Sequence, residues 1–276
     1  MKKTDVFFVI HNYNTVPTHL LDYCVDHVLY DASDDPSVIE RLAGWKRRAV
    51  RNTGHNITSY FRYFDESYES LPAFVALLKG NIIGRHVSKE FFDRVYDNHH
   101  YTFLYEDRTV RETVNRGVYF LAQENEYLEV NNSWYVDSRH PKRYFWEYNR
   151  LLRFVFKDPV LPEYCLFSPG ACYIVTREQV RKRSRQFYVN LHKIMSYVEG
   201  SRFPSEAHMV ERMLHTIFTA CYPVNDWMND EADFERALSE VAAESKASAA
   251  PVPGAISRAI RKTIRVLEGL QGRLGP

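Results

Sequence analysis

The sequence has few cysteines, and their spacing gives no support to a disulfide framework. Four occur in 276 residues, and no two of them form a C-x-x-C pair. These are Cys24, Cys165, Cys172 and Cys221. Each lies in or near an apolar run, so we expect buried free thiols in a protein of a reducing compartment.

Long hydrophobic runs are also missing. No segment approaches the roughly 18 apolar residues that a membrane-spanning helix needs. Near the N-terminus, the apolar run Val6–Ile10 is too short for the core of a signal peptide. We therefore expect a cytoplasmic protein.

An excess of charge of either sign is lacking. Lys and Arg together number 36 and Asp and Glu 35, which gives a formal net charge of +1. No overall basic field attracts nucleic acid, so we predict no nucleic-acid partner. A charged ligand must instead be met by a local cluster of residues.

Four familiar site motifs are absent. The patterns GxxxxGK[ST], GxGxxG, GxSxG and HExxH do not occur. Their absence removes support for an ATPase, a dinucleotide oxidoreductase, an α/β-hydrolase and a zinc protease. What the chain does contain is 19 tyrosines and 17 phenylalanines, which indicate an aromatic core more often than a ring-stacking site.

The first 85 residues alternate between apolar runs and helical patterns. The runs at 6–10, 28–30 and 75–79 are typical of buried strands, and the segments 36–45 and 57–68 have helical spacing. This rhythm predicts an α/β sheet, with ligands binding outside the carboxyl ends of its strands. The loops expected at that edge are 11–14, 31–35, 52–56 and 79–86.

The rest of the chain suggests three parts. We assign residues 1–228 to one domain, 229–254 to an acidic helix with a linker, and 255–276 to a basic amphipathic helix. Within the first part, residues 87–165 form an aromatic-rich insertion. A strand at 172–175, with Thr176 as helix cap, then precedes helices at 177–199 and 205–220.

Local cations follow the strand that ends at Lys79. Lys79, Arg85 and His86 can offset the charge of an anion, as a metal ion can. Asn52 and Gly54-His55 lie at the start of a predicted helix, and the N-terminus of a helix can bind an anion. Taken singly, Lys79 is better explained as a solvated charge and Gly80 as a turn glycine. The sheet argument, which places these loops together, favours a site.

A second group opens the helix predicted at 205–220. Glu206 and His208 are the predicted catalytic residues, with the Glu206 carboxylate as general base. The alternative is that Glu206 only complements the helix dipole. His208, Glu211 and His215 also have the spacing of metal ligands on a helix, but no further ligand pair lies nearby, so a metal site is not favoured.

The basic helix predicted at 255–276 permits two interpretations. Its apolar side carries Ile256, Ile260 and Ile264, with arginines around it. It can lie on an anionic membrane surface, which would place the protein at the inner membrane. It can also pack on the body of the protein or on a second copy of the chain.

Four segments together resemble a family of fungal and bacterial proteins that is known as a domain of unknown function and has glycosyltransferase-like character. They are NTGHNITSY at 52–60, LPAFVALLKGN at 71–81, SPGACYIVTRE at 168–178 and PSEAHMVER at 204–212. The resemblance covers residues 5–222. It implies a GT-A-like, Rossmann-type mixed sheet flanked by helices, with the aromatic-rich insertion and a C-terminal helical tail. In that fold an Asp-x-Asp that holds a metal would match the end of the segment 76–81, where this chain has Lys79-Gly80-Asn81.

The resemblance implies a glycosyltransferase that moves a sugar from a nucleoside diphosphate, such as a UDP-sugar, to a saccharide acceptor or a lipid-linked saccharide. The setting would be bacterial surface polysaccharide or lipopolysaccharide assembly, without a metal or other cofactor. The residues expected to bind the donor are His11, Asn12, Asn14, Asp31, Asn52, Gly54, His55, Lys79, Gly80, Asn81, Arg85 and His86. Those expected to bind the acceptor are Trp134, Pro169, Gly170 and Ala171. The alternative is a carbohydrate- or nucleotide-binding module without catalysis, and a homo-oligomer is left open.

Overall fold

The computed structural model describes residues 2–106, 120–123, 126–132, 140–200 and 203–248. Trp134, the linker residues 249–254 and the tail 255–276 lie outside the described residues. No helix of the described part has the length and hydropathy needed to span a bilayer.

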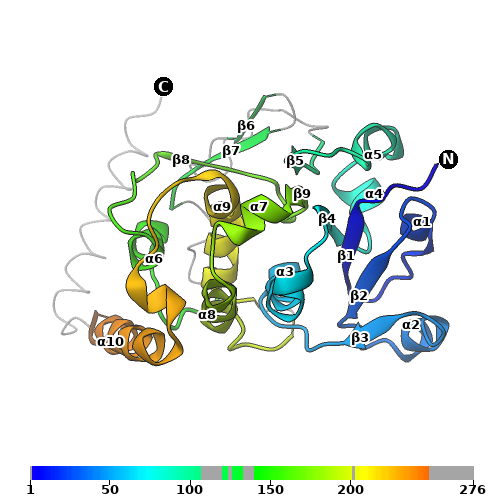
Figure 1. Cartoon of the computed structure of the whole chain (residues 1–276). Helices are drawn as coiled ribbons and strands as arrows, with labels where there is room; N and C mark the ends of the chain where they lie inside the picture. The colour runs from blue at the N-terminus through cyan, green and yellow to red at the C-terminus, as the bar shows by residue number, and fades with distance from the viewer. Residues whose placement is uncertain (1, 107–119, 124–125, 133–139, 201–202, 249–276) are drawn as a thin grey trace, which may run out of the picture.

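The larger of two sheets has six strands in the order β3-β2-β1-β4-β9-β5 (Figure 1). Their bounds are β1 Phe7–Asn12, β2 His27–Asp31, β3 Arg47–Ala49, β4 Phe74–Lys79, β5 Thr102–Phe103 and β9 Tyr173–Thr176. The first four in this order are parallel, β9 is antiparallel to β4, and β5 is antiparallel to β9. From β1 the chain continues to β2 and β3 on one side, whereas β4 lies on the other. The strand order therefore reverses between β1 and β4, and open α/β sheets bind ligands at such a point.

The central strands β1 and β4 are apolar up to the polar residues at their carboxyl ends, because helices cover both of their faces. Phe8, Val9 and Ile10 of β1 have no exposed surface, and neither do Leu77 and Leu78 of β4. Val9 and Leu77 belong to the core under α3, α8 and α9, whereas Phe8 and Leu78 face α1, α2 and α5 (Figure 1). These helices are α1 Thr18–Leu21, α2 Pro36–Arg41, α3 His55–Ser67, α5 Lys89–Val95, α8 Arg185–Met195 and α9 Ser205–Thr219. This burial on two faces explains the continuous apolar runs in the sequence.

A smaller antiparallel sheet, in the order β6-β7-β8, packs through β8 against α9. Its strands are β6 Phe120–Gln123, β7 Glu126–Val130 and β8 Tyr164–Phe167. The remaining elements are α4 Ile82–Arg85, α6 Tyr148–Val155, α7 Arg177–Arg181, α10 Glu231–Ser248 and the 3₁₀ turns η1 Tyr68–Ser70 and η3 Asp226–Asn229. The predicted insertion at 87–165 thus supplies β5, the second sheet and α6.

The α/β prediction is confirmed as a mixed sheet flanked by helices, and the predicted cap at Thr176 is present. Asp35 caps α2 by accepting from the Ser37 N–H, and Thr176 forms a capping box with Gln179 at α7. The single helix predicted at 177–199 is wrong, because Ser184 interrupts it and caps α8 by accepting from the Phe187 N–H. The predicted acidic helix is α10.

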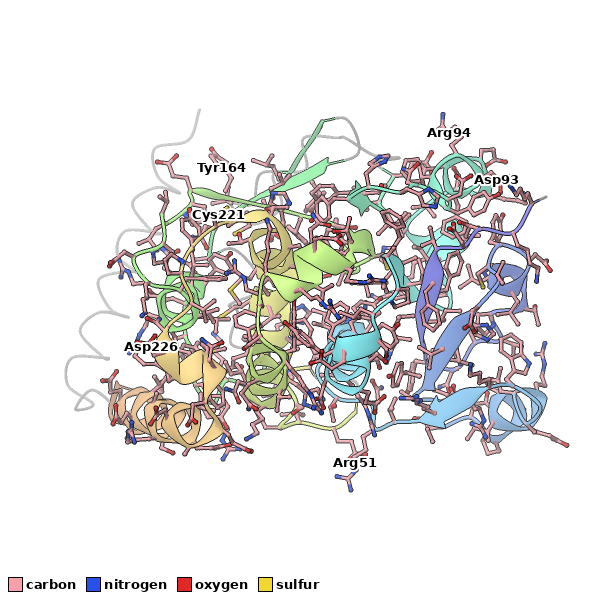
Figure 2. All side chains as sticks on the ribbon, in the orientation of Figure 1. Arg51, Asp93, Arg94, Tyr164, Cys221 and Asp226 are labelled. Atoms are coloured by element: carbon pink, nitrogen blue, oxygen red, sulfur yellow. The ribbon has the colours of Figure 1, made fainter. Side chains whose placement is uncertain are left out.

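The cysteines follow the expectation with one exception. Cys24, Cys165 and Cys172 are buried free thiols, whereas Cys221 is exposed (Figure 2). The prediction of a buried Cys221 was wrong because the residue follows the end of α9, beyond that helix's packed face.

Candidate functional site

Two neighbouring strand ends form the floor of the candidate site. β1 and β4 pair in parallel, and their register sets His11 beside Lys79. His11 points toward α3, where its Nδ1 lies 2.8 Å from the Ser59 hydroxyl oxygen. A cavity of about 210 Å³ opens here, at the point where the strand order reverses. Its walls include Asn52, His55, Asn81 and Arg85 as well as the two strand-end residues.

The cavity contains two cationic groups without an anionic partner. Within the described part of the chain, neither the Lys79 ammonium nor the Arg85 guanidinium forms an ion pair or a side-chain hydrogen bond. Burial lowers the pKa of Lys79 and the charge of Arg85 lowers it further, while Glu211 opposes the shift. A partly buried cation without a partner is costly, and an anionic ligand would relieve that cost.

Three histidines near Lys79 are neutral at pH 7. Burial, followed by the Lys79 charge, lowers the pKa of His11 to about 3, of His55 to about 3 and of His86 to about 4. His86 was expected to offset diphosphate charge, but it carries none at this pH. Its Nε2 is buried without a partner in the described structure, and its ring lies so close to Gly170 that a Cβ there would be 2.7 Å away.

Asn12, Asn14 and Asp31, which were expected to contact a donor, are engaged within the protein. Asp31 accepts from Arg47 at 2.7 Å, and Asn12 Nδ2 donates to the same carboxylate at 3.1 Å. Asn14 Oδ1 accepts from the Asp34 backbone N–H at 3.1 Å. None of the three lines the 210 Å³ cavity, so their contacts fix the loops that surround it.

Two glycines permit close approaches at the edges of the cavity. A Cβ at Gly80 would lie 2.5 Å from Asn12 Oδ1. Gly54 has a φ of +54°, and a Cβ there would lie 2.7 Å from the Met195 carbonyl oxygen. His55 follows with a φ of +68°, a conformation that is rare for a residue with a side chain. The turn into α3 therefore holds the His55 ring in place through an unusual backbone path.

Glu206 is placed apart from this cavity. Its carboxylate is fully buried, and Oε1 accepts from the backbone N–H groups of Arg143, Tyr144 and Phe145 at 2.8–3.2 Å. The Tyr197 hydroxyl donates to Oε2 at 2.7 Å. Four donors satisfy both oxygens, so the geometry supports a structural carboxylate that anchors residues 143–145 to α9, and gives no support to a general base.

His208, Glu211 and His215 do not converge on one point. Glu211 accepts from the Gly170 N–H and from Arg212, each at 2.7 Å, and its Oε2 lies 3.9 Å from His208 Nδ1. His215 lies apart, with Nδ1 3.2 Å from the Tyr101 hydroxyl. No group of three or more metal-ligating side chains occurs among the described residues.

Comparison with known proteins gives a family. The family described as "Protein of unknown function (DUF3431)" matches residues 16–226. The chain belongs to this family. No curated protein and no solved structure matches the chain.

The family segment contains most of the candidate site. Asn52, His55, Lys79 and Arg85 all lie within residues 16–226, whereas His11 at the end of β1 precedes them. The predicted acceptor segment 169–171 also falls inside it. There Gly170 has a φ of +89° and Ala171 of +57°, and the Gly170 carbonyl accepts from Asn56 at 2.9 Å.

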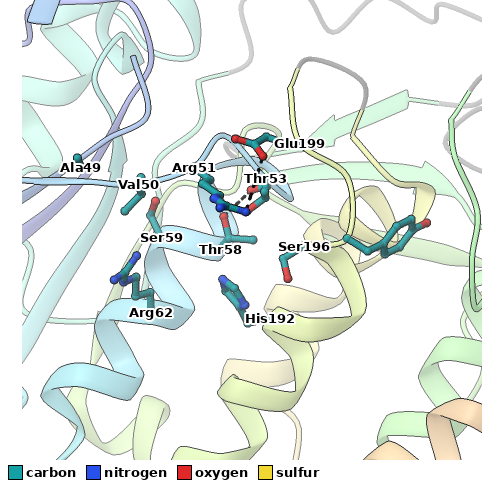
Figure 3. Close-up of a pocket in the computed structure, with 11 residues that line it drawn as sticks. Ala49, Val50, Arg51, Thr53, Thr58, Ser59, Arg62, His192, Ser196 and Glu199 are labelled. Atoms are coloured by element: carbon teal, nitrogen blue, oxygen red, sulfur yellow. Dashed lines mark hydrogen bonds and ion pairs between the residues drawn. The ribbon is translucent and has the colours of Figure 1, made fainter. Parts of the chain in front are cut away.

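A larger cavity of about 650 Å³ also borders the segment 51–59 (Figure 3). Arg62 and Ser59 of α3 face His192 of α8 and Ser196, which directly follows that helix, across it. Its arginines are already paired, Arg62 with Glu66 at 2.8 Å and Arg51 with Glu199 at 3.9 Å. The smaller cavity, with its unpaired cations, is therefore the better candidate for an anion.

Sequence reasoning missed Asn56 and the position of Glu211 beside the site. Asn56 directly follows His55, but its partner Gly170 is 114 positions away, so no local pattern shows the contact. Phe203, whose ring packs 4.4 Å from that of His55, was missed for the same reason.

Proposed function

We propose that this chain is a glycosyltransferase that uses a nucleoside diphosphate sugar without a metal ion. The observation that carries the proposal is the unpaired Lys79 ammonium in a cavity between the carboxyl ends of β1 and β4. This is the position at which the GT-A-like resemblance expects a metal-binding Asp-x-Asp. A fixed cation there can stabilise the charge of a departing diphosphate, which is the task of the metal in other transferases.

Lys79 and Arg85 would hold the diphosphate. Both groups line the same cavity and both lack anionic partners in the described chain. The cavity, at about 210 Å³, is smaller than the 300 to 1,000 Å³ typical of sites for drug-sized ligands. We therefore place the diphosphate and its sugar in the cavity and the nucleoside outside it.

The acceptor in this proposal is a saccharide, free or lipid-linked, of surface polysaccharide assembly. Its hydroxyl must lose a proton as the new bond forms, so a base must be present in the cavity. Glu206 is not assigned this task, because four donors already occupy its oxygens.

A binding module without catalysis is the second candidate. The engaged carboxylate of Glu206 favours it, since the base expected from the sequence is unavailable. Such a module would use the same cations to hold a nucleotide or a phosphorylated sugar without cleaving it.

The test combines donor hydrolysis with thermal melting over a panel of sugar nucleotides, each with and without chelator. A transferase is expected to hydrolyse one donor slowly in both conditions. Donor at 100 times Kd should add about 2.7 kcal/mol of stability. A melting shift without hydrolysis would support the binding module. If no donor is hydrolysed and none shifts the melting temperature, the transferase and a nucleotide-binding module are both contradicted.

Lys79→Met is the variant that tests the cation directly. It keeps the length of the side chain and removes the charge, so donor affinity should fall at least tenfold, as expected for about 1.5–3 kcal/mol per charged hydrogen bond. The melting temperature without ligand should equal or exceed that of the parent protein, because the substitution removes a buried cation that has no partner. Lys46→Met removes a 75% exposed charge and serves as the control. Unchanged donor affinity in Lys79→Met would contradict the assigned role.

A further inference from the structure

We propose that His55 is the proton acceptor of this site: Asn56 fixes the proton of its ring on Nδ1, which leaves Nε2 as a free lone pair on a wall of the cavity. This inference rests on the proposed function for its substrate, an acceptor hydroxyl. The tautomer assigned to His55 does not depend on the proposed function, because it follows from the contacts of Asn56 alone.

The orientation of the Asn56 amide is determined by a carbonyl group. Asn56 is buried, and its Nδ2 lies 2.9 Å from the Gly170 carbonyl oxygen and 2.7 Å from the Tyr60 hydroxyl. A carbonyl oxygen only accepts, so the atom that faces Gly170 must be the amide nitrogen. The other end of the amide, Oδ1, therefore faces the ring of His55.

That orientation fixes the tautomer of His55. Asn56 Oδ1 lies 2.9 Å from His55 Nδ1, and an amide oxygen has no proton to give. Nδ1 must carry the hydrogen and donate it. In a neutral imidazole the remaining nitrogen, Nε2, then has a lone pair and acts as an acceptor.

The surroundings keep this ring neutral and in place. Burial, followed by the charge of Lys79 on β4, lowers the pKa of His55 to about 3. From α9, Glu211 raises the pKa and His208 lowers it, while Asn56 raises it through its hydrogen bond. Phe203 packs on the ring at 4.4 Å and His208 at 5.7 Å. The positive φ of His55 is the kind of backbone strain that persists where the surrounding structure enforces it, as at functional sites.

Donor binding would turn this weak base into a stronger one. Lys79 depresses the pKa of His55, so a diphosphate that neutralises Lys79 raises it toward the working pH. Nε2 then takes the proton of the acceptor hydroxyl as the hydroxyl oxygen bonds to the anomeric carbon. The bond from that carbon to the diphosphate oxygen breaks, and its electron pair leaves with the diphosphate beside Lys79 and Arg85.

The tautomer is measured on protein labelled with ¹⁵N-histidine, with His55→Gln used to assign the signals. We expect a proton on Nδ1 and none on Nε2 at pH 7. Adding inorganic pyrophosphate should raise the pKa of His55, and in Lys79→Met that pKa should already be higher without ligand. A proton on Nε2, a charged ring at pH 7 or a pKa indifferent to pyrophosphate would overturn the proposal.

Steady-state kinetics test the proton transfer. The substrates are an acceptor saccharide and the sugar nucleotide that the protein hydrolyses in the panel. His55→Gln should lower kcat by about a hundredfold or more with donor affinity unchanged, and should remove the acid limb of the pH profile. Asn56→Ala should shift that limb, because the ring loses its fixed tautomer. His100→Gln, at an exposed position, is the control and should match the parent protein. An unchanged kcat in folded His55→Gln would overturn the role.

The failure of the proposed function is distinguishable from the failure of this inference. A parent protein that neither binds nor hydrolyses any donor overturns the proposed function. The nitrogen signals of the same sample still decide whether His55 presents a proton acceptor to the cavity.

Discussion

At the scale of single residues, the site combines two cations that lack partners with three histidines that carry no charge. The cause is burial, which lowers the pKa of Lys79 and of each histidine. The histidines start from about 6.5 and Lys79 from 10.5, so the same burial removes the charge of the histidines first. The cavity therefore offers positive charge to an anion and neutral nitrogens to hydroxyl groups.

The neutral histidines predict a loss of stability in mild acid. His11, His55 and His86 titrate near 6.5 in the unfolded chain but only near about 3, 3 and 4 in the folded one. Between these values the unfolded state binds more protons, so the free energy of unfolding is fully present above pH 6.5 and falls as the pH drops toward 4. Each histidine contributes up to about 1.4 kcal/mol per pH unit. Thermal melting at pH 7, 6 and 5 measures the effect.

Two variants separate this effect from general acid sensitivity. His55→Gln removes one of the three groups, so its melting temperature should fall less between pH 7 and 5. His100→Gln removes an exposed histidine and should behave like the parent protein. A melting temperature that is flat over this range would contradict the burial of neutral histidines.

Glu206 gives a prediction in which stability and activity separate. In Glu206→Gln one oxygen becomes an NH₂ group, which cannot accept from the donors that surround it. The cost of such a mismatch is about 1–3 kcal/mol. At about 2–4 °C per kcal/mol for a chain of this size, calorimetry should show a clear drop in melting temperature.

Donor turnover of Glu206→Gln, measured well below its melting temperature, should stay close to that of the parent protein. The structural role leaves the cavity intact, since Glu206 does not line it. A hundredfold loss of turnover at an unchanged melting temperature would instead support Glu206 as the general base.

At the scale of elements, the sequence predicts the sheet better than it predicts the site. Continuous apolar runs identify the parallel strands, and fold logic then brings Lys79, His55 and His11 to one edge, as the structure shows. Contacts between distant segments have no such signal. The link from Asn56 to Gly170 and the burial of Glu206 under residues 143–145 depend on how α3 and α9 pack, and helical spacing alone does not contain that information.

The entry into α3 is a rigid element, and Gly54→Ala tests it. The substitution combines a φ of +54° with a Cβ only 2.7 Å from the Met195 carbonyl oxygen, which belongs to α8 and cannot move freely. Such strain and overpacking cost about 1–3 kcal/mol each. We expect a lower melting temperature together with slower donor turnover, since His55 directly follows Gly54 and its ring would be displaced.

Gly44→Ala is the matched control for this element. Nothing lies within 4 Å of a Cβ at Gly44, so the same chemical change should leave both stability and donor turnover unaltered. Equal melting temperatures for the two alanine variants would contradict the rigid turn.

At the scale of the whole molecule, the cavity is assembled from segments that are far apart in the sequence. The ends of β1 and β4, the turn before α3 and the segment around Phe203 all contribute to its walls. Most of this framework lies in the family segment 16–226, and α10 and the basic tail lie beyond it. Substitutions in the tail therefore leave every residue that lines the cavity unchanged.

The tail predicted as a basic amphipathic helix, residues 255–276, lies outside the described residues, and attachment to anionic membranes is one of the two interpretations that its sequence permits. It carries five basic residues against the single acid Glu268. Basic residues near an anionic surface contribute about 1 kcal/mol each, and the isoleucines of the apolar side add to this. The full chain should sediment with vesicles that contain phosphatidylserine and not with phosphatidylcholine vesicles.

A double substitution, Ile260→Glu with Ile264→Glu, distinguishes the two interpretations of this helix. If the tail lies on a membrane, the variant stays in the supernatant, because its apolar side is lost, while donor turnover in solution is unchanged. If the tail packs on a second copy of the chain, the variant elutes as a smaller species in gel filtration and vesicle binding does not change. Binding to anionic vesicles that survives the substitution would contradict membrane attachment through this helix.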